Sequence, residues 1–405
     1  MSSEPDRRII DLPANRNGEP GWNGSRRVER ALRHQESDRI PLDIGGTRVT
    51  GIHLQAYHGY RARLGLPPSK PELQVRYLQL PRVEEDFRSV LGVDLESIDP
   101  DTLVRETETK QDGNGGARYT DMWGCGWYMP KDGAYFDLSR FPLAEAESLK
   151  DLERYNWPPG DDPAMLFHMA EQAREIRDGH RRAIVLGRTS PGIFEMCSVL
   201  CGYEKAMMDL AGNPALSEAI MDRVLEHKFE YYRAAIGLLR SAGVEFFIIS
   251  ESDDLGSQSG LLVSPQMYRR LVKPRHTRLF EMIKDCSGGR AAVELHCCGA
   301  IREILPDLIE AGVEVLNPVQ VSAAGMDTAE LKREFGNSIV FHGGGVDSQA
   351  TLPYGTPAEV RDEVRRRIED LAPGGGFIFT PVHSIQLDVP VENFMAMIET
   401  FYEYA

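Results

Sequence analysis

The sequence predicts an α/β fold, a (β/α)8 TIM barrel with an N-terminal extension. Six short apolar runs rich in β-branched residues alternate with helical segments after residue 180. Continuous apolar runs of this length are typical of strands buried on both faces, as in a parallel sheet covered by helices. The chain has 405 residues, which suits one barrel with insertions. Two further strands are expected earlier in the chain, and a doubly wound sheet is the alternative.

The N-terminal part predicts an arm followed by the first barrel elements. Residues 1–24 are rich in Pro, Asn, Gly and charge, so we expect a flexible arm, with a single barrel domain over residues 25–405. A helix is expected from Arg27, with Val28 and Ala31 on its apolar face. It leads to a short strand in IPLDIGG.

The middle of the chain is less regular. The segment DMWGCGWYMP (121–130) is interpreted as a hairpin-like insertion, and NWPPGDDP (156–163) as a connector. The aromatic residues of the 121–130 segment, Trp123, Trp127 and Tyr128, either form the wall of a pocket or pack within the hairpin. Large aromatic side chains chiefly supply buried area.

The regular part predicts its strands and helices individually. The expected strands are AIVLG (183–187), VEFFIIS (244–250), AAVEL (291–295), VEVLN (313–317), SIVFH (338–342) and GFIFT (376–380). A helix after Thr356 has a capping box with Glu359 and Pro357 in its first turn, and Gly374–Gly376 ends it. Pro306 fits a helix only if it lies in the first turn or if the helix is kinked there.

Composition limits the classes of function. The net charge of −16 argues against nucleic acid and anionic membranes as partners, because both need a basic face. The N-terminus has no apolar run of a signal peptide, and no segment approaches a membrane span. Six irregularly spaced cysteines favour reduced thiols or metal ligands, so a cytoplasmic location is expected. The sequence is compatible with a homodimer and does not decide the oligomeric state.

Polar residues follow five of the expected strands, where a barrel keeps its active site. They are Glu251, Asp253, Asp254, His296, Cys297, Cys298, Asn317, Gln320, His342 and His383. The sharpest signal is His296-Cys297-Cys298. Since alternate strand residues share a face, His296 and Cys298 project together while Cys297 points to the helices.

Imidazole and thiolate are a natural zinc pair, and His383 is the candidate third ligand. Two observations weigh against this hypothesis: free cysteines are usually buried core residues, and strands five and eight lie across the barrel from each other. A shared metal therefore requires these side chains to meet near the axis.

The remaining polar residues have two interpretations each. Glu251, Asp253 and Asp254 are candidates for general acid/base catalysis or auxiliary metal binding, and Gln258 for hydrogen bonding to substrate; alternatively they form a solvated turn with Asp254 as a cap. The HGGGVD run (342–347) either binds an anion through its backbone or forms a turn with positive φ.

Several stretches together resemble the uroporphyrinogen decarboxylase superfamily. They are DDLGSQSGLLVSPQMYRRLVKPRHTRLFEMIK (253–284), LHCCGAIREILPDLIEAGVEVLNPVQ (295–320), HGGGVDSQATLPYGTPAEVRDEV (342–364) and PVHSIQLDVPVENF (381–394), with RVERALRHQESDRIPLD (27–43) near the start. This resemblance covers most of residues 27–405 and implies a TIM barrel.

The chain departs from both main activities of that superfamily. The decarboxylases carry an Arg-rich M-R-Q-A-G-R element that holds porphyrinogen carboxylates, whereas IGGTRVTGIH (44–53) keeps only Arg48. The cobalamin-dependent methyltransferases bind zinc through H-x-C and a distant Cys. Here His296 and Cys298 match the H-x-C, and His383 stands at the distant position. The chain therefore resembles a divergent, methyltransferase-like branch.

The resemblance implies a zinc-dependent methyltransferase or demethylase that works with a corrinoid or a thiol acceptor. Its metal ligands would be His296, Cys298 and His383, and Arg48, Gln258, Asn317 and Gln320 would contact the small-molecule substrate. Because the chain has no D-x-H-x-x-G corrinoid motif, the corrinoid is expected on a partner protein. The rivals are a metal-independent decarboxylase or lyase on a small carboxylic acid, and a barrel that binds a tetrapyrrole without turnover.

Overall fold

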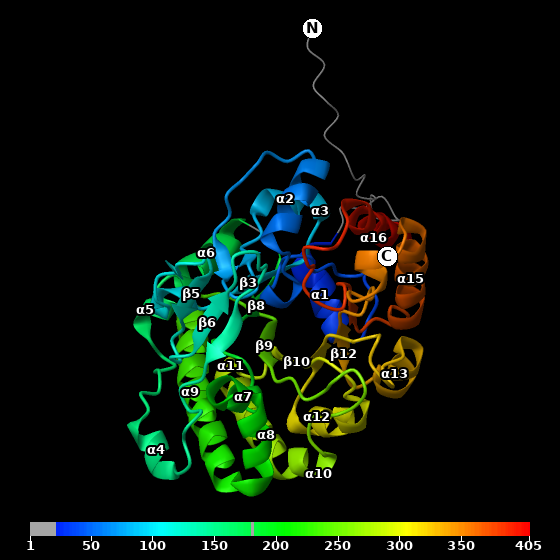
Figure 1. The fold of residues 1–405 in the computed structure, drawn as a ribbon. Coiled ribbons are helices and arrows are strands. Elements are labelled where there is room, and N and C mark those ends of the chain that lie inside the picture. Colours follow the sequence, from blue (N-terminus) through cyan, green and yellow to red (C-terminus); the bar gives the residue numbers. More distant parts are fainter. Residues whose placement is uncertain (1–21, 180–181) are drawn as a thin grey trace.

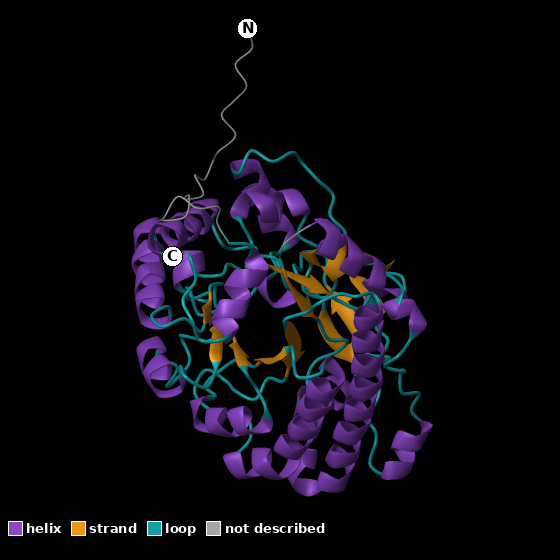
Figure 2. Ribbon diagram, turned by 180° about the vertical axis from the view of Figure 1, so that it is seen from behind, coloured by secondary structure: helices purple, strands orange, loops and turns teal. Residues whose placement is uncertain are grey.

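A computed structural model describes residues 22–179 and 182–405 of the chain. The expected arm, residues 1–24, lies outside the described residues up to position 21. Within the described part, an inner ring of strands is surrounded by helices (Figures 1 and 2). This arrangement confirms the predicted (β/α)8 barrel.

Seven parallel strands form the inner sheet in the order β13-β12-β11-β10-β9-β8-β3. They are β3 (Leu95–Ile98), β8 (Ala183–Leu186), β9 (Ile248–Ser252), β10 (Ala292–His296), β11 (Val315–Asn317), β12 (Val340–His342) and β13 (Phe377–Ile378). All six runs predicted after residue 180 become strands. The run at 244–250 is displaced: its strand begins at Ile248 and ends at Ser252, because residues 244–247 carry the chain from the preceding helix to the sheet.

The eighth strand position is filled by the segment around Leu42, which closes the ring. Leu42 pairs in parallel with Phe379, just beyond β13. On one side the N–H of Asp43 donates to the carbonyl of Phe379 at 2.9 Å, and on the other the N–H of Asp94 donates to the carbonyl of Leu42 at 2.8 Å. The expected strand in IPLDIGG is thus reduced to a short closing segment, but it occupies the predicted place.

Helices cover the outside of the ring (Figure 1). They are α1 (Gly24–Leu32), α2 (Leu54–Arg63), α3 (Glu85–Leu91), α4 (Leu149–Arg154), α5 (Pro163–Leu166), α6 (Met169–Gly179), α7 (Glu195–Cys201), α8 (Tyr203–Gly212), α9 (Pro214–Ser241), α10 (Pro265–Met267), α11 (Lys273–Ser287), α12 (Leu305–Ala311), α13 (Thr328–Phe335), α14 (Thr351–Tyr354), α15 (Pro357–Leu371) and α16 (Val391–Tyr404). No helix in the described ranges is both long and apolar enough to cross a membrane.

Two helix starts follow the expected sequence signals. Thr356 caps α15 and forms a capping box with Glu359, with Pro357 in the first turn. Pro306 lies in the first turn of α12, where its missing N–H costs no hydrogen bond, so α12 needs no kink.

The core has two layers that follow the alternation of side chains along the strands. Inward-pointing residues such as Leu95, Ile248 and Val315 form the inner layer, which Val28 and Ala31 of α1 close at the amino ends of the strands. Residues of the other parity join the larger layer between strands and helices. The inner wall at the carboxyl ends of the strands is polar instead, and this difference locates the site.

A separate antiparallel sheet corrects the expected hairpin at 121–130. It consists of β4 (Lys110–Gln111), β5 (Ala117–Thr120), β6 (Gly126–Met129) and β7 (Asp137–Arg140), paired in that order. The insertion therefore has four strands, of which the 121–130 segment contributes one. A small hairpin of β1 (Leu73–Val75) and β2 (Leu80–Pro81) precedes it.

Candidate metal centre and its cavity

A cavity of about 340 Å³ lies at the carboxyl ends of the barrel strands. Its floor comes from residues at or beyond the ends of β8, β9 and β10 and from the segment after β13, including Arg188, Asp254, His296 and His383. Its opposite wall comes from the insertion and the preceding hairpin. This is the end of the barrel at which the sequence predicts the chemistry.

Three candidate ligands meet at the edge of the cavity floor, where His296 and His383 line the cavity and Cys298 lies beside them. One ligand atom from each of His296, Cys298 and His383 lies within 4.8 Å of the others. The Cys298 Sγ is 3.4 Å from the His296 Nε2, and the centroids of the His296 and His383 rings are 5.5 Å apart. Ligand atoms of a tetrahedral zinc lie about 3.3–3.8 Å apart, so the set closes on an ion with about 1 Å of side-chain movement. Although the strands stand across the barrel, these side chains do meet near its axis.

The imidazole of His296 is held in a ligand-ready state. Its Nδ1 lies 2.6 Å from the Oδ1 of Asn317, an oxygen that can only accept, so Nδ1 carries the proton and Nε2 keeps its lone pair. Burial lowers the pKa of His296, and burial together with His296 lowers the pKa of His383 to about 4. Both rings are therefore neutral at pH 7, as metal binding requires.

The two adjacent cysteines point in opposite directions, as predicted. Cys297 is fully buried in the layer between strands and helices, whereas Cys298 is half-buried beside His296. Burial, followed by the nearby Asp254, raises the pKa of the Cys298 thiol. Without a cation next to it this thiol stays protonated, so a bound metal is what would make it a thiolate.

Strand parity separates the three candidate carboxylates. Asp254 lines the cavity and its Oδ1 accepts the N–H of Cys298 at 2.8 Å. Asp253 points the other way, where it accepts the N–H groups of Phe194 and Glu195 and lies 2.9 Å from His276. The structure therefore places Asp253 at the start of α7, outside the barrel wall.

Glu251 also faces the helices. Its carboxylate accepts two hydrogen bonds from the fully buried Lys228 on α9, at 3.0 and 2.9 Å, and one from Tyr232 at 2.6 Å. Because β9 extends to Ser252, Glu251 is a strand residue of outward parity. The acid/base role expected for Glu251 and Asp253 thus has no geometric support, and Asp254 alone of the three reaches the cavity.

The four expected substrate contacts are dispersed. Arg48 lines the cavity. Gln258 and Gln320 line a neighbouring cavity on the far side of Cys298. Asn317 lies behind His296, where its Oδ1 accepts from the imidazole and its amide donates to the His342 carbonyl at 2.9 Å, and it lines neither cavity.

Sequence reasoning missed several charged residues of the cavity, among them Arg188 and Glu195. Arg188 follows β8, and the Nη1 of Arg48 donates to its carbonyl at 3.0 Å; within the described chain neither guanidinium is in an ion pair with a carboxylate. Glu195 opens α7, and burial, followed by Asp254 and Asp253, raises its pKa to about 8. Arg188 could have been found, because it is a polar residue directly after the predicted strand AIVLG. Glu195 had no such signal, because it lies in an ordinary helix start.

The HGGGVD run takes the turn conformation. Gly343 and Gly344 have φ of 103° and 87°, which other residues rarely adopt. His342, before them, points into the barrel, where its Nδ1 is 2.6 Å from Glu294 and its Nε2 is 3.1 Å from Asp43. Burial opposes its charge, but these two carboxylates raise the pKa of His342 to about 10. It is a buried cation of the barrel interior.

The aromatic patch both lines the cavity and packs within the insertion. Trp123 and Trp127 line the cavity. Trp127 also stacks on Tyr77 at 4.9 Å and on Tyr119 at 6.1 Å, and its Nε1 donates to Asp121 at 2.8 Å. Tyr128 takes no part in the cavity wall. The insertion thus forms an aromatic roof over the cavity.

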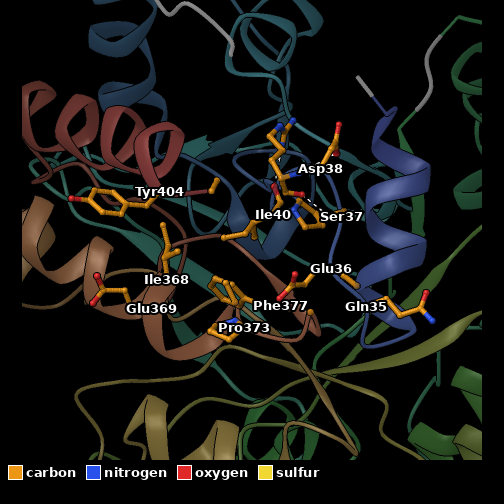
Figure 3. Close-up of a pocket in the computed structure, with 16 residues that line it drawn as sticks. Gln35, Glu36, Ser37, Asp38, Ile40, Ile368, Glu369, Pro373, Phe377 and Tyr404 are labelled. Atoms are coloured by element: carbon orange, nitrogen blue, oxygen red, sulfur yellow. Dashed lines mark hydrogen bonds between the residues drawn. The ribbon is translucent and has the colours of Figure 1, made fainter. Parts of the chain in front are cut away.

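Another hollow, of about 360 Å³, lies at the amino end of β13 (Figure 3). Three of its charged residues already have partners: Asp38 accepts from Arg27, Arg39 pairs with Asp94, and Glu36 accepts the N–H of Gly374. It is far along the barrel from the predicted chemistry, so we assign it no part in the site.

Fold and site together define a TIM-barrel protein with a polar cavity at the carboxyl ends of its strands. The family model described as uroporphyrinogen decarboxylase (URO-D) matches residues 121–404. The uroporphyrinogen decarboxylase of Psychromonas ingrahamii is 31% identical over 93% of this chain and 96% of its own length. That of Alkalilimnicola ehrlichii is 24% identical over 93% of both chains. The chain therefore belongs to the uroporphyrinogen decarboxylase family.

A solved structure extends the likeness to the whole fold. A methyltransferase from Methanosarcina mazei superposes with a TM-score of 0.62 at 20% sequence identity, covering 95% of this chain and 99% of that one. At this identity the likeness supports the fold alone, and it agrees with the barrel described above.

Proposed function

We propose that the protein is a zinc-dependent methyltransferase or demethylase that works with a corrinoid protein or a thiol acceptor. One observation carries this proposal: the neighbours His296 and Cys298 meet the distant His383, with one ligand atom of each within 4.8 Å of the others, beside the floor of a cavity that the two histidines line. Three protein ligands leave a fourth position for a reactant, as in catalytic zinc sites.

The chemistry of the donor set fits zinc. Two neutral imidazoles and one thiol are borderline-soft ligands of the kind that zinc selects over calcium or magnesium. The hydrogen bond from His296 to Asn317 supplies the outer support that metal-bound histidines usually have. Zinc bound here would supply Lewis-acid activation of a thiol or of a methyl-bearing heteroatom.

The other residues would bind and enclose the reactants. Arg48 and Arg188 offer guanidinium groups to an anionic end of a substrate. The roof of Tyr77, Tyr119 and Trp127 restricts water above the cavity floor. Asp254, hydrogen-bonded to the backbone of Cys298, is placed to accept a proton near the reacting centre.

The transfer step balances with a corrinoid as co-reactant. A methylated corrinoid would supply the methyl group, which would pass to the thiol sulfur while the electron pair of the broken bond would stay with the corrinoid and the thiol proton would pass to solvent. The reverse demethylation follows the same path. The Methanosarcina mazei neighbour is a methyltransferase, which is consistent with methyl transfer, and a partner carrying the corrinoid would approach the same end of the barrel.

Metal analysis tests the proposal. Protein purified under reducing, zinc-replete conditions should hold about one zinc per chain, and His296→Ala and Cys298→Ala should lose it. Cys297→Ala is the matched control, because this neighbouring thiol faces the helices; it should keep the metal. Methyl transfer between methylcobalamin and a thiol, followed by absorbance, should depend on the same two residues. Persistent absence of zinc would refute the proposal.

A metal-independent carboxy-lyase is the second candidate, because several relatives are named uroporphyrinogen decarboxylase. Its chemistry would use Glu195, whose pKa of about 8 keeps it protonated at neutral pH. As the carbon–carbon bond of a carboxylate held by Arg48 and Arg188 breaks and CO2 leaves, Glu195 would donate a proton to the carbon. Release of CO2 by zinc-free protein, abolished in Glu195→Gln, would favour this candidate.

A further inference from the structure

A second cavity, of about 460 Å³, adjoins the metal centre on the side of Cys298. Four glutamines line it, Gln258, Gln320, Gln349 and Gln386, together with three serines. All of its lining residues are described, and apart from Cys298 and His383 none has an ionisable side chain. We refer to it as the glutamine cavity.

The candidate ligands form the partition between the two cavities. His296 lines only the first cavity, which also contains Arg48 and Arg188. Cys298 lines only the glutamine cavity. His383 lines both. The fourth position of a metal in this set is thus adjacent to a charged space on one side and an uncharged space on the other.

Gln320 shows that the glutamine cavity has unused hydrogen-bonding capacity. The residue is only 7% exposed, and its Oε1 accepts the N–H of Gly299 at 2.7 Å. Its Nε2 makes no hydrogen bond within the described chain, but this nitrogen is accessible to solvent. The amide nitrogen therefore faces the cavity and offers two donors to a ligand.

We propose that the glutamine cavity binds the second reactant of the transfer, which enters it with an uncharged, hydrogen-bonding group of the carboxamide type. A carboxamide complements glutamine and serine side chains in both donors and acceptors. A charged group would lose its hydration there with no counter-charge to replace it. The inference rests on the proposed function for calling the ligand a reactant, and it implies that both reactants occupy the site at once, one in each cavity.

Alkylation of Cys298 tests the cavity without requiring zinc or turnover. Zinc-free protein, prepared with a chelator, is treated with iodoacetamide or with iodoacetate, which differ only in carboxamide against carboxylate. In both reactions the thiolate displaces iodide, and mass spectrometry follows each cysteine separately. Methyl methanethiosulfonate, uncharged and without an amide, reports the reactivity of each thiolate, and all rates are expressed relative to it. Cys286, half-buried on α11, is the internal reference.

The expected result is a preference for iodoacetamide over iodoacetate that is about tenfold greater at Cys298 than at Cys286. Gln320→Glu keeps an acceptor for the Gly299 N–H but removes the donors. It should therefore lower the relative iodoacetamide rate at Cys298 by about three- to tenfold, the effect of one lost hydrogen bond. Gln55→Glu, an exposed residue of α2, adds the same charge outside the cavity and should change nothing.

Equal preferences at Cys298 and Cys286, or an unchanged rate in Gln320→Glu, would each overturn the inference. These outcomes are separate from failure of the proposed function. A protein that binds no zinc and transfers no methyl group, but keeps the carboxamide preference, would refute the function and leave the glutamine cavity as a carboxamide site.

Discussion

At the scale of single residues, the side of the barrel wall to which a side chain points decides which chemistry is open to it. In β9 and the residues after it, Ser252 and Asp254 face the cavity while Glu251 and Asp253 face the helices. In β10 the same alternation gives His296 and Cys298 to the site and Cys297 to the core. One residue of register along a strand therefore separates a candidate site residue from a structural one.

We predict that Asn317→Leu weakens zinc binding by about 10- to 100-fold, because the variant no longer fixes the proton of His296 on Nδ1. Asn317→Asp keeps an acceptor for that proton and should retain most of the affinity. Competition with a zinc chelator of known affinity measures both. Equal weakening in the two variants would show that Asn317 acts through packing alone.

A second prediction concerns the buried ion pair that removes Glu251 from the site. Lys228→Met leaves the Glu251 carboxylate buried without its cation, which should lower the free energy of unfolding by about 3–5 kcal/mol. Lys228→Met combined with Glu251→Gln removes both charges and should recover much of that loss. Urea denaturation compares the two variants, and a double variant no more stable than the single one would contradict the coupling.

The candidate metal ligands could be predicted from the sequence, because they come directly after predicted strands and because alternate residues along a strand point to the same side. The roles of Glu251 and Asp253 could not, because the apolar run VEFFIIS suggests a strand that ends at residue 250, and the true end at Ser252 depends on pairing with β10. Arg188 directly follows the predicted strand AIVLG and so had a sequence signal, whereas Glu195 reaches the cavity only through the packing of α7 and the loop before it. Such tertiary placement leaves no pattern in the sequence.

At the scale of elements, the antiparallel sheet β4–β7 converts an open barrel mouth into a cavity. Trp127 holds it in place by stacking between Tyr77 and Tyr119. The sequence predicted an aromatic insertion here but only a hairpin, because the outer strands β4 and β7 are short, polar and exposed. Their pairing comes from the neighbouring strands rather than from their own composition.

We predict that Trp127→Ala loosens this roof. Loss of the stacked ring and of the hydrogen bond to Asp121 should speed amide hydrogen exchange over residues 117–129, while β9 and β10 keep their protection. Hydrogen exchange followed by mass spectrometry measures both regions. Tyr128→Ala, on the next residue of the same strand, is the control outside the cavity wall. Equal acceleration in the two variants would show that the stack does not fix the roof.

At the scale of the whole molecule, a single buried cation connects distant parts of the ring. His342 on β12 contacts Glu294 on β10 and Asp43 in the closing segment. Asp43 also accepts hydrogen bonds from the hydroxyl groups of Thr47 and Thr50 at 2.8 and 2.9 Å. The cluster thus links the first barrel segment to two later strands inside the core.

This cluster predicts a loss of stability in alkaline solution. The pKa of His342 is about 10 in the folded protein against an ordinary value of 6.5, so folding favours the protonated form. The stabilisation is fully present below about pH 6.5 and is lost as the pH rises through about 10. Between pH 7 and pH 10 the free energy of unfolding should fall more in the wild type than in His342→Gln. His58→Gln, at an exposed position, should behave as the wild type; equal slopes in all three would contradict the assignment.

The pairing of Leu42 with Phe379 has a consequence for biosynthesis. The segment that completes the ring leaves the ribosome among the first fifty residues, but its partner follows more than three hundred residues later. Until then the Leu42 segment, already paired on its other side with the start of β3, has an unpaired edge toward β13, and such edges attract other chains. The nascent protein therefore spends most of its translation as an open, curved sheet, and it becomes a barrel only when the last strand is released.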